Sequence, residues 1–339
     1  MSGYVVRMKV LVTGGAGYIG STVATALAEA GHVPVVLDDL SRGARAFTRG
    51  WDLYVGDYGD RALIRHIIGE HPDLHATIHC GAKIVVPDSV AHPYDYYLTN
   101  VSRSLELVDE LVQRGKARFI FSSSGSVYAP SDSFEVHEES PLAPTSPYAR
   151  TKMVLEMALA DIAAGTDLRV ISLRYFNPIG ASPSLRSGTR DALPSHVLGR
   201  LVAAARGDVE SFVITGTDLP TRDGTGLRDY VHVWDLARAH VAAVERFDDA
   251  LQQDVGASSV INLGTGQGVT VRELVAAFER VSGPVPISEG PPRPGDAIGA
   301  WANVDKAARL LGWRSELGLD DGIASALAWD RRRAEVVGE

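Results

Sequence analysis

Cysteine is almost absent from this chain, since Cys80 is the only one among 339 residues. An internal disulfide is therefore impossible, and a cysteine cluster that binds metal is excluded. Long hydrophobic runs are missing too: none reaches the length of a membrane span, and residues 1–8 lack the apolar core of a signal peptide. These absences predict a cytoplasmic protein with no metal site and no membrane partner.

A surplus of positive charge is also lacking. The formal net charge is −9 at pH 7, which argues against nucleic acid or an anionic membrane as the main partner. A local group of arginines can still bind a small anionic ligand. The apolar fraction of 45% and the charged fraction of 22% are ordinary for a globular protein, and the length suits one large domain or two closely joined ones.

A glycine-rich turn is the most informative feature that is present. Lys9–Thr13 predicts a short buried parallel strand, and residues 18–30 predict an amphipathic helix. Gly14, Gly17 and Gly20 punctuate the junction at three-residue spacing. Such a turn lets backbone N–H groups at a helix N-terminus approach a pyrophosphate, which side chains there would block.

An acidic pair follows at the expected distance from this turn. The apolar run 33–37 ends in Asp38 and Asp39, and Asp38 comes eighteen residues after Gly20. A carboxylate at the tip of the second strand accepts hydrogen bonds from the adenosine ribose hydroxyls and repels a 2′-phosphate. The pattern therefore favours NAD over NADP as the cofactor.

The order of predicted elements indicates an α/β fold with a doubly wound parallel sheet of the Rossmann type. Strand candidates lie near 9–13, 33–37, 51–55, 75–80, 117–123 and 169–175, with helical patterns between them. From Pro178 this rhythm breaks. Segments 230–233 and 260–263 are predicted to return to the main sheet as strands, and helices are expected near 194–206, 270–282 and 320–334.

We accordingly predict two units. Residues 1–177 plus 231–264 form an NAD-binding Rossmann domain, and residues 178–230 plus 265–339 form a smaller, discontinuous C-terminal cap that binds substrate. The cap covers the carboxyl edge of the sheet, where doubly wound proteins bind ligands.

Tyr148 and Lys152 are the candidate catalytic pair. Their spacing places both side chains on one face of a helix. A free tyrosine has a pKa near ~10, and a neighbouring ammonium together with the positive nicotinamide ring brings that pKa toward the working range of a base. The strand 118–124 ends in hydroxyls, of which Ser124 or Ser126 could bridge the reacting oxygen and the tyrosine.

These residues resemble the extended short-chain dehydrogenase/reductases, and among them the UDP-galactose (UDP-glucose) 4-epimerases. The resemblance extends nearly end to end. It rests on T-G-G-A-G-Y-I-G at 13–20, F-S-S-S-G-S-V-Y at 121–128, S-P-Y-A-R-T-K at 146–152, L-R-Y-F-N-P-I-G-A at 173–181, D-G-T-G-L-R-D-Y at 223–230 and R-P-G-D at 293–296. The resemblance implies an NAD-dependent enzyme that acts on a nucleotide sugar.

The resemblance also implies residue roles. Tyr148, Lys152 and Ser124 would be catalytic. The predicted cofactor-binding residues are Gly14, Gly17, Tyr18, Ile19, Gly20, Asp38, Asp39, Asp57, Tyr58, Lys83, Asn100, Ser122 and Tyr175. The predicted substrate-binding residues are Ser126, Asn177, His196, Val197, Arg228, Arg293, Asp296 and Ala300.

Several of these assignments have a physical reading of their own. Guanidinium groups at Arg228 and Arg293 suit a diphosphate bidentately, and Asp296 could accept from the uridine ribose. Lys83 matches a family lysine near the nicotinamide only to within one residue of register. Arg103 stands where the family usually has a small glycine.

Other polar residues have structural interpretations. Asp235 is predicted to cap a helix that starts at Leu236. His79 and His232 lie in apolar strands and are interpreted as core histidines whose hydrogen bonds are satisfied.

The predicted reaction is C4 epimerisation of UDP-glucose and UDP-galactose. Related dehydratases and decarboxylases carry an acidic residue directly after the serine-tipped strand, where this chain has Gly125 and Ser126. Another nucleotide-sugar 4-epimerase (of a pentose or uronate), a net dehydrogenase and a non-catalytic NAD(H)-responsive binding protein stay open as alternatives. By the same resemblance Ala300 would line the sugar pocket, where a small residue implies additional use of N-acetylated sugars. The apolar helical patterns near 90–114 and 147–164 predict a homodimer.

Overall fold

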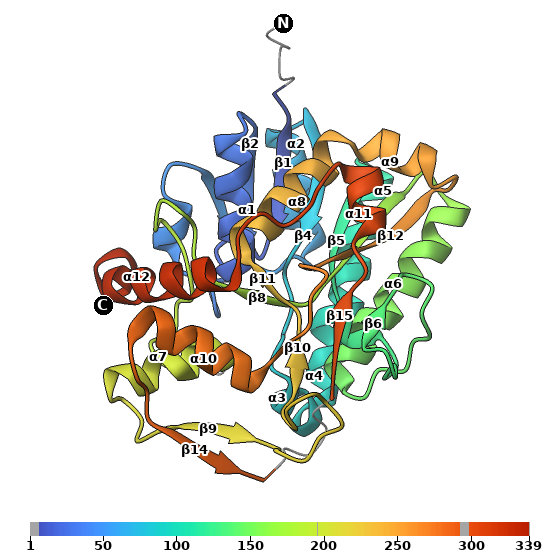
Figure 1. The fold of residues 1–339 in the computed structure, drawn as a ribbon. Coiled ribbons are helices and arrows are strands. Elements are labelled where there is room, and N and C mark those ends of the chain that lie inside the picture. The colour runs from blue at the N-terminus through green and yellow to red at the C-terminus, as the bar shows by residue number, and fades with distance from the viewer. Residues whose placement is uncertain (1–6, 195, 292–297, 339) are drawn as a thin grey trace, which may run out of the picture.

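A parallel seven-stranded sheet forms the centre of the molecule (Figure 1). The computed structural model describes residues 7–194, 196–291 and 298–338. The strand order is β12-β7-β5-β4-β1-β2-β3, so the chain winds outward from β1 in both directions, and the doubly wound prediction is confirmed. The bounds are β1 Lys9–Thr13, β2 Val33–Asp38, β3 Asp52–Val55, β4 Leu74–His79, β5 Arg118–Ser124, β7 Arg169–Tyr175 and β12 Ser258–Leu263.

Helices cover both faces of this sheet because each buried strand alternates its side chains between the faces. Val10 and Val12 share a hydrophobic cluster with one set of helices, and Leu11 shares a cluster with the other. The first set is α1 (Tyr18–Glu29), α8 (Val233–Glu245), α9 (Phe247–Gln253) and α11 (Asp305–Leu311). The second set is α2 (Arg61–Glu70), α5 (Ser104–Gln113) and α6 (Pro147–Gly165).

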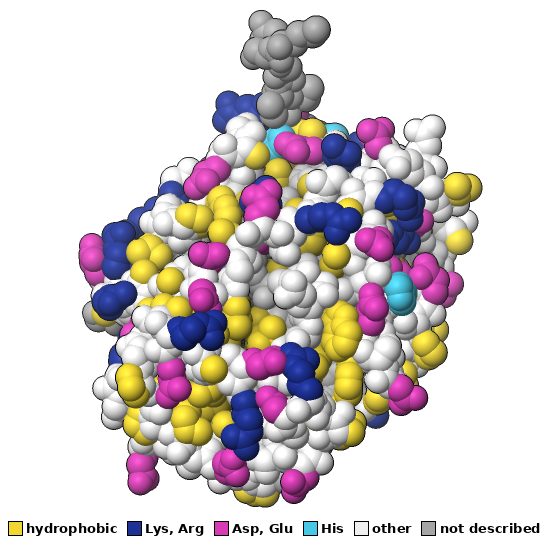
Figure 2. Space-filling model, in the orientation of Figure 1, with side chains coloured by type: hydrophobic (Ala, Val, Ile, Leu, Met, Phe, Trp, Pro, Cys, Tyr) yellow, Lys and Arg dark blue, Asp and Glu magenta, His cyan; other side chains and the backbone are white. Residues whose placement is uncertain are grey.

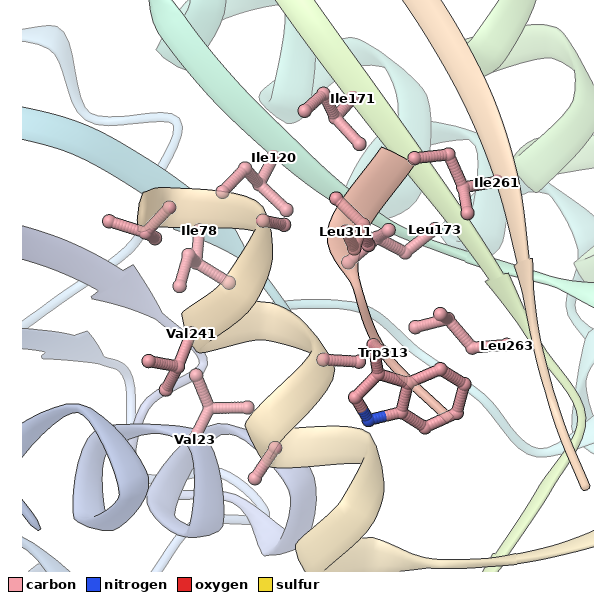
Figure 3. Packing of buried hydrophobic residues seen from close by; sticks show 14 of the residues in the cluster. Val23, Ile78, Ile120, Ile171, Leu173, Val241, Ile261, Leu263, Leu311 and Trp313 are labelled. Carbon is pink, nitrogen blue, oxygen red and sulfur yellow. The ribbon is translucent and has the colours of Figure 1, made fainter. Parts of the chain in front are cut away.

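Figure 3 shows the first of these clusters from close by. Ile78, Ile120 and Ile171 from neighbouring strands belong to it, together with Val241 of α8. Trp313, just after α11, completes the cluster, and its indole N–H donates to the Asp235 carbonyl at 2.9 Å. Burial of these aliphatic side chains in a dry core is the main stabilising contribution to the sheet.

A smaller group of elements packs beyond the carboxyl edge of the main sheet (Figure 1). Its core joins side chains of α7, α10 and α12 to those of short strands. The helices are α7 Val197–Arg206, α10 Val271–Ser282 and α12 Leu319–Val337. The strands form three small sheets. The first has the order β13 (Val269–Thr270), β10 (Leu227–Arg228), β15 (Gly299–Ala302) and β6 (Glu135–Val136). The second pairs β11 (Tyr230–His232) with β8 (Asn177–Ile179), and the third pairs β14 (Ile287–Gly290) with β9 (Phe212–Thr215).

Short helical pieces complete the chain. They are η1 Arg45–Thr48, α3 Val86–Ala91, α4 Pro93–Tyr97, η2 Leu98–Arg103 and η3 Gly125–Val127. The segment η2 is π-helical and joins α4 to α5, so the apolar pattern near 90–114 folds as several pieces rather than one helix. π-Helical turns are rare and occur mostly near functional sites.

Two local predictions were wrong. Segment 230–233 does not return to the main sheet, because β11 pairs with β8 after the chain has left the sheet at Tyr175. Asp235 is not a helix cap. Helix α8 starts at Val233, and the His232 ring caps it by accepting the Trp234 N–H at 3.0 Å.

Asp235 instead holds a loop that lies far away in the sequence. Its buried carboxylate accepts the backbone N–H groups of Glu316 (2.8 Å) and Leu317 (2.7 Å), which lead into α12. The predicted interpretation of His79 and His232 is confirmed, since both are buried and hydrogen-bonded. The division into two units stays a prediction. Helix α11, which belongs to the predicted cap, packs on β12 of the main sheet and on α8, which covers that sheet.

The surface carries charges of both signs. Acidic and basic side chains are interspersed over the face in Figure 2, in keeping with a modest net charge of −9. Within residues 7–194, 196–291 and 298–338, no helix is long and apolar enough to cross a membrane. Among the same residues, no three His, Cys, Asp or Glu side chains gather in a way that could hold a metal ion.

Candidate active site

The glycine turn between β1 and α1 leaves no room for side chains. Gly14 has φ +67°, and a Cβ built there would lie 2.7 Å from the Gly81 backbone. A Cβ on Gly20 would lie 2.2 Å from the Gly14 carbonyl oxygen. Gly17 occupies the N-cap position of α1 without a side-chain cap, so the first N–H groups of the helix point outward with no intrahelical acceptor. This is a site for an anionic group.

Asp38 lies beside this turn at the tip of β2. Its two oxygens accept the Ala16 N–H (2.9 Å) and the Leu40 N–H (2.8 Å), and burial raises the pKa of the carboxyl. Asp39 is more exposed and turns away, since its carboxylate accepts from the backbone and hydroxyl of Ser41. Of the two acidic residues, Asp38 is therefore the one that faces the predicted cofactor site.

Asp57 and Tyr58 lie at the far side of the turn. The Tyr58 ring packs so close to Gly81 that a Cβ there would lie 2.7 Å from it, and its hydroxyl donates to the Thr99 carbonyl. Asp57 accepts the Gly59 N–H at 2.8 Å and forms an ion pair with Arg103. The residue that replaces the usual glycine thus pairs with a predicted cofactor-binding carboxylate.

Asn100 connects the loop after β4 to α6 through hydrogen bonds. Its side chain accepts the Lys83 N–H at 2.8 Å and donates to the Lys83 carbonyl at 2.9 Å and to Thr151 at 3.1 Å. The Lys83 ammonium lies 3.5 Å from Asp95 and near the Tyr96 ring. In this structure Lys83 therefore contributes its backbone to the site, whereas its side chain pairs with α4.

Tyr148 and Lys152 lie in the first turns of α6, which follows the N-cap Ser146 and begins at Pro147. The Lys152 ammonium is 3% exposed, donates to the Ser122 carbonyl at 2.8 Å and lies 4.8 Å from the Phe121 ring centre. Burial lowers the pKa of Lys152 to about 8. An ammonium has three N–H donors, so beside this bond to Ser122 Lys152 can also donate to hydroxyls of a bound ligand.

Tyr148 is aimed at the serine-tipped end of β5. Burial raises the pKa of its phenol, whereas a hydrogen bond with Ser124 acts in the opposite direction. The Ser124 hydroxyl lies 2.9 Å from that of Ser126. The structure therefore brings together Tyr148, Ser124 and Ser126, and both hydroxyl candidates stay within reach of a shared substrate oxygen.

Ser122 of β5 and Tyr175 of β7 lie at the same carboxyl edge of the main sheet. Ser122 is fully buried, and its hydroxyl bonds to His240 (3.1 Å) and Cys80 (3.2 Å), so its carbonyl is what meets Lys152. Tyr175 pairs in register with Ser124, and burial raises the pKa of its phenol well above the usual value.

The predicted substrate residues meet where β10 and β15 run side by side. Arg228 and Ala300 are register partners, and Asn177 pairs with Tyr230 on the neighbouring strands. Arg228 donates to the Ile298 carbonyl at 3.0 Å.

The remaining substrate candidates divide into two groups. His196 is the N-cap of α7, where its ring accepts the Gly199 N–H at 3.1 Å, and Val197 is the first helical residue. Two of the predicted cofactor-binding residues, Tyr18 and Ile19, open α1, and the Tyr18 hydroxyl donates to the Gly180 carbonyl at 2.7 Å. Arg293 and Asp296 lie outside the described residues.

Sequence reasoning missed two residues that shape this region. Asp229 is fully buried and accepts four hydrogen bonds, from the backbone and hydroxyl of Thr265 and from the Gly266 and Ala302 N–H groups. It thereby joins the end of β12 to β15. Phe176 covers Gly125 so closely that a Cβ there would lie 2.7 Å from its ring. The only signals available were the position of Asp229 inside a polar motif and the glycine at 125.

Comparison with known proteins decides the family. The model of the "NAD dependent epimerase/dehydratase family" matches residues 10–264. A UDP-glucose 4-epimerase of Azospirillum brasilense is 40% identical over 334 residues, which covers 98% of this chain and 94% of the relative. The chain belongs to this family.

Solved structures agree with that membership. A UDP-glucose-4-epimerase from Stenotrophomonas maltophila, with bound NAD and formylated UDP-arabinopyranose, has a TM-score of 0.91 at 37% identity and covers 97% of this chain and 99% of that one. The UDP-Glc/GlcNAc 4-epimerase of Campylobacter jejuni has a TM-score of 0.80 at 32% identity, with coverage of 96% and 99%. The resemblance inferred from the motifs is thus confirmed.

NAD is the cofactor of this epimerase/dehydratase chain, and the described residues fit it. The uncapped N-terminus of α1 suits the pyrophosphate, and Asp38 suits the adenosine ribose. The spare donors of Lys152 suit the hydroxyls of the nicotinamide ribose. When bound, NAD supplies hydride transfer, and the chain's own residues orient it and handle the proton.

We expect Tyr148→Phe to lower kcat by ~10²-fold or more, because it removes the only ionisable oxygen of that ring and retains its packing. NAD binding and the melting temperature should stay near those of the wild type. Turnover is measured on purified enzyme with UDP-galactose as substrate. The matched control is Tyr94→Phe, since Tyr94 is 75% exposed on α4. Near-normal turnover of a folded Tyr148→Phe enzyme would rule out the assignment of the base.

Proposed function

We propose that this chain is an NAD-dependent epimerase that interconverts UDP-glucose and UDP-galactose at C4 through a transient 4-keto sugar. The observation that carries this proposal is the placement of Tyr148 and Lys152 beside Ser124, at a site with no carboxylate at positions 125 and 126. Relatives that cover nearly the whole chain are named UDP-glucose 4-epimerase.

The residues divide the chemistry among them. Tyr148 takes the proton of the sugar 4-hydroxyl, and Ser124 bridges that oxygen to the phenol. The buried Lys152 ammonium favours the phenolate form of Tyr148. Arg228 holds the diphosphate, so the 4-keto sugar can turn about this tether and present its other face before reduction.

The lack of a carboxylate at positions 125 and 126 bears on which reaction the site supports. Dehydration or decarboxylation needs a group that works at C5 or C6, and the ring of Phe176 fills the space a side chain at position 125 would need. A non-catalytic NAD(H) sensor has no need of Ser124, Tyr148 and Lys152 together. Oxidation and re-reduction at a single carbon is therefore the reaction that the site supports best.

The direct test is product identification. Purified enzyme is incubated with UDP-galactose, UDP-glucose and the corresponding pentose and uronate nucleotides, and products are identified by chromatography and NMR. We expect each UDP-hexose to yield a mixture of both C4 epimers. Exclusive use of a pentose or uronate, or net oxidation of the sugar, would replace this function with one of the alternatives.

We further propose that N-acetylated UDP-hexoses are substrates, because Ala300 leaves room beside the sugar. Ala300 packs against a small cluster that includes Tyr128 and Phe176, next to the serine-tipped strand. A relative acting on both UDP-Glc and UDP-GlcNAc shares the fold at 32% identity. Even one methylene matters in a tightly packed pocket, so a ring at this position should exclude an acetyl group.

The expected result is turnover of UDP-N-acetylglucosamine by the wild type. Ala300→Tyr should lower kcat/KM for the acetylated sugar by ~10²-fold relative to that for UDP-glucose. Ala300→Ser is the matched control, since it keeps a small side chain and should leave the ratio of the two kcat/KM values unchanged. No turnover of acetylated sugars by the wild type, or an unchanged ratio in the tyrosine variant, would contradict the role of position 300.

We also propose a homodimer, with α3, α4 and α6 at its interface. These helices pack on one another and carry large apolar side chains that are exposed in the single chain. They are Val90 (65%), Tyr94 (75%) and Met157 (59%). The apolar residues first suggested by the helical pattern, among them Val108, Leu111, Leu155 and Leu159, are buried within their own chain and are therefore not the contact surface.

Light scattering at micromolar concentration should give the mass of two chains. Val90→Asp combined with Met157→Asp should shift the mass toward one chain, because an isologous contact places each charge twice in the interface. A monomeric wild type would contradict the proposal. The cytoplasmic location predicted from the sequence stays a prediction.

A further inference from the structure

A buried ion pair lies directly beneath the proposed catalytic residues. The carboxylate of Glu156 on α6 meets the guanidinium of Arg174 on β7 at 2.6, 3.0 and 3.1 Å. Glu156 is 8% exposed and Arg174 is 4% exposed. Two buried charges are a poor way to stabilise a fold, since desolvation offsets most of their attraction. Their presence at this place therefore points to a role in the reaction.

The pair is tied to the strand that carries Ser124. The Ser123 hydroxyl donates to the Glu156 carboxylate, and Ser123 is the register partner of Arg174 across β5 and β7. The next partners along the two strands are Ser124 and Tyr175. Glu156 thus connects α6 to both strands, at positions one residue before Ser124 and Tyr175 at the active site.

Arg174 also connects this ion pair to the loop after β5. Its guanidinium donates to the Tyr128 hydroxyl at 3.0 Å and to the Glu138 carbonyl at 3.1 Å. Tyr128 in turn donates to the Asn262 side chain on β12 at 2.6 Å. A continuous set of buried hydrogen bonds therefore runs from α6 across the carboxyl edges of β5, β7 and β12.

Helix geometry relates Glu156 to the catalytic pair. Tyr148, Lys152 and Glu156 follow one another at intervals of four on one face of α6, so Glu156 lies one turn beyond Lys152. On the basis of the proposed epimerase function, we propose that Glu156 is a positioning residue. Fixed by its ion pair with Arg174, it determines where Tyr148 and Lys152 of α6 lie relative to Ser124 of β5.

The charge of Glu156 has a second effect on Lys152. Burial lowers the pKa of Lys152 to about 8, and the negative charge of Glu156 opposes that decrease. Removal of this charge should therefore lower the pKa of Lys152 further and make the ammonium deprotonate at a lower pH. The charged or ionisable groups that face Lys152 or its neighbours are His79 and Cys80 on β4 and its loop, Tyr148 and Glu156 on α6, and Arg174 and Tyr175 on β7.

Two variants separate positioning from simple stabilisation. Glu156→Gln keeps the shape and removes the charge. The double variant Glu156→Met with Arg174→Met replaces both charges by apolar groups, which restores stability where a buried pair is only structural. The matched control is Asp254→Asn, which breaks the largely buried Asp254–Lys306 pair (2.8 Å) at the amino end of β12, away from the site.

In the NAD-loaded enzyme, Glu156→Gln should lower kcat for UDP-galactose by ~10-fold or more with a KM within ~3-fold of the wild type. The alkaline decline of kcat should also begin at a lower pH. The folded double variant should show the same loss. Asp254→Asn should lower the melting temperature and leave kcat and its pH profile unchanged.

A direct titration gives a readout that does not depend on turnover. Lysine occurs only at positions 9, 83, 116, 152 and 306, so ¹³Cε-lysine NMR resolves Lys152, with Lys152→Met for assignment. Its midpoint should lie near 8 in the wild type and at a lower pH in Glu156→Gln. It should not move in Asp254→Asn.

A double variant with wild-type kcat and an unshifted Lys152 midpoint would overturn the proposal. If the double variant fails to fold, Glu156→Gln decides, and a wild-type kcat together with an unshifted Lys152 midpoint in that variant would overturn the proposal. If the wild type itself turned over no UDP-hexose, the proposed function would fail, whereas the Lys152 titration would still test what Glu156 does.

Discussion

A buried ammonium at the carboxyl edge of a parallel sheet is the constraint around which this structure is arranged. Lys152 is 3% exposed and has one backbone carbonyl, that of Ser122, as its hydrogen-bond acceptor. An isolated charge in such a place would lose its proton, because burial favours the neutral form. The carbonyl of Ser122, the ring of Phe121 and the carboxylate of Glu156 all act against that loss. Without the charge, Tyr148 would have no cation to favour its phenolate.

The main sheet could be predicted from the sequence because its signals are local. Each buried strand is a short apolar run, and Gly14 and Gly20 of the first turn are required by close contacts with the loop after β4 and within the turn. The two wrong predictions concern residues whose partners lie far along the chain. β11 pairs with β8 rather than with the main sheet, and Asp235 bonds to a loop some eighty residues away. No local pattern at these positions distinguishes the observed partner from a nearer one.

In the candidate site, too, local patterns could be predicted and distant partners could not. The positions of Tyr148, Lys152, Ser124 and Asp38 could be predicted because motif spacing fixes them on known elements. The groups that hold them could not. Asp229 joins three backbone segments, and Arg174 reaches helix α6 and the loop after β5. In the sequence Asp229 is one polar residue of a polar motif and Arg174 is a polar residue in an apolar strand, and only the fold shows how many partners each one has.

The chemistry of the site depends on an apolar contact as much as on its charges. Gly125 follows Ser124 directly, and the ring of Phe176 lies where a side chain at position 125 would begin. That ring is itself held, because it stacks near Tyr128 with centres 6.5 Å apart, and the Tyr128 hydroxyl is fixed by Arg174 and Asn262. An acid at position 125 would have to displace Phe176 and with it part of the network that anchors Glu156. The same buried network that contains Glu156 therefore also keeps an acidic side chain out of position 125, in keeping with a proposed reaction at one carbon of the sugar.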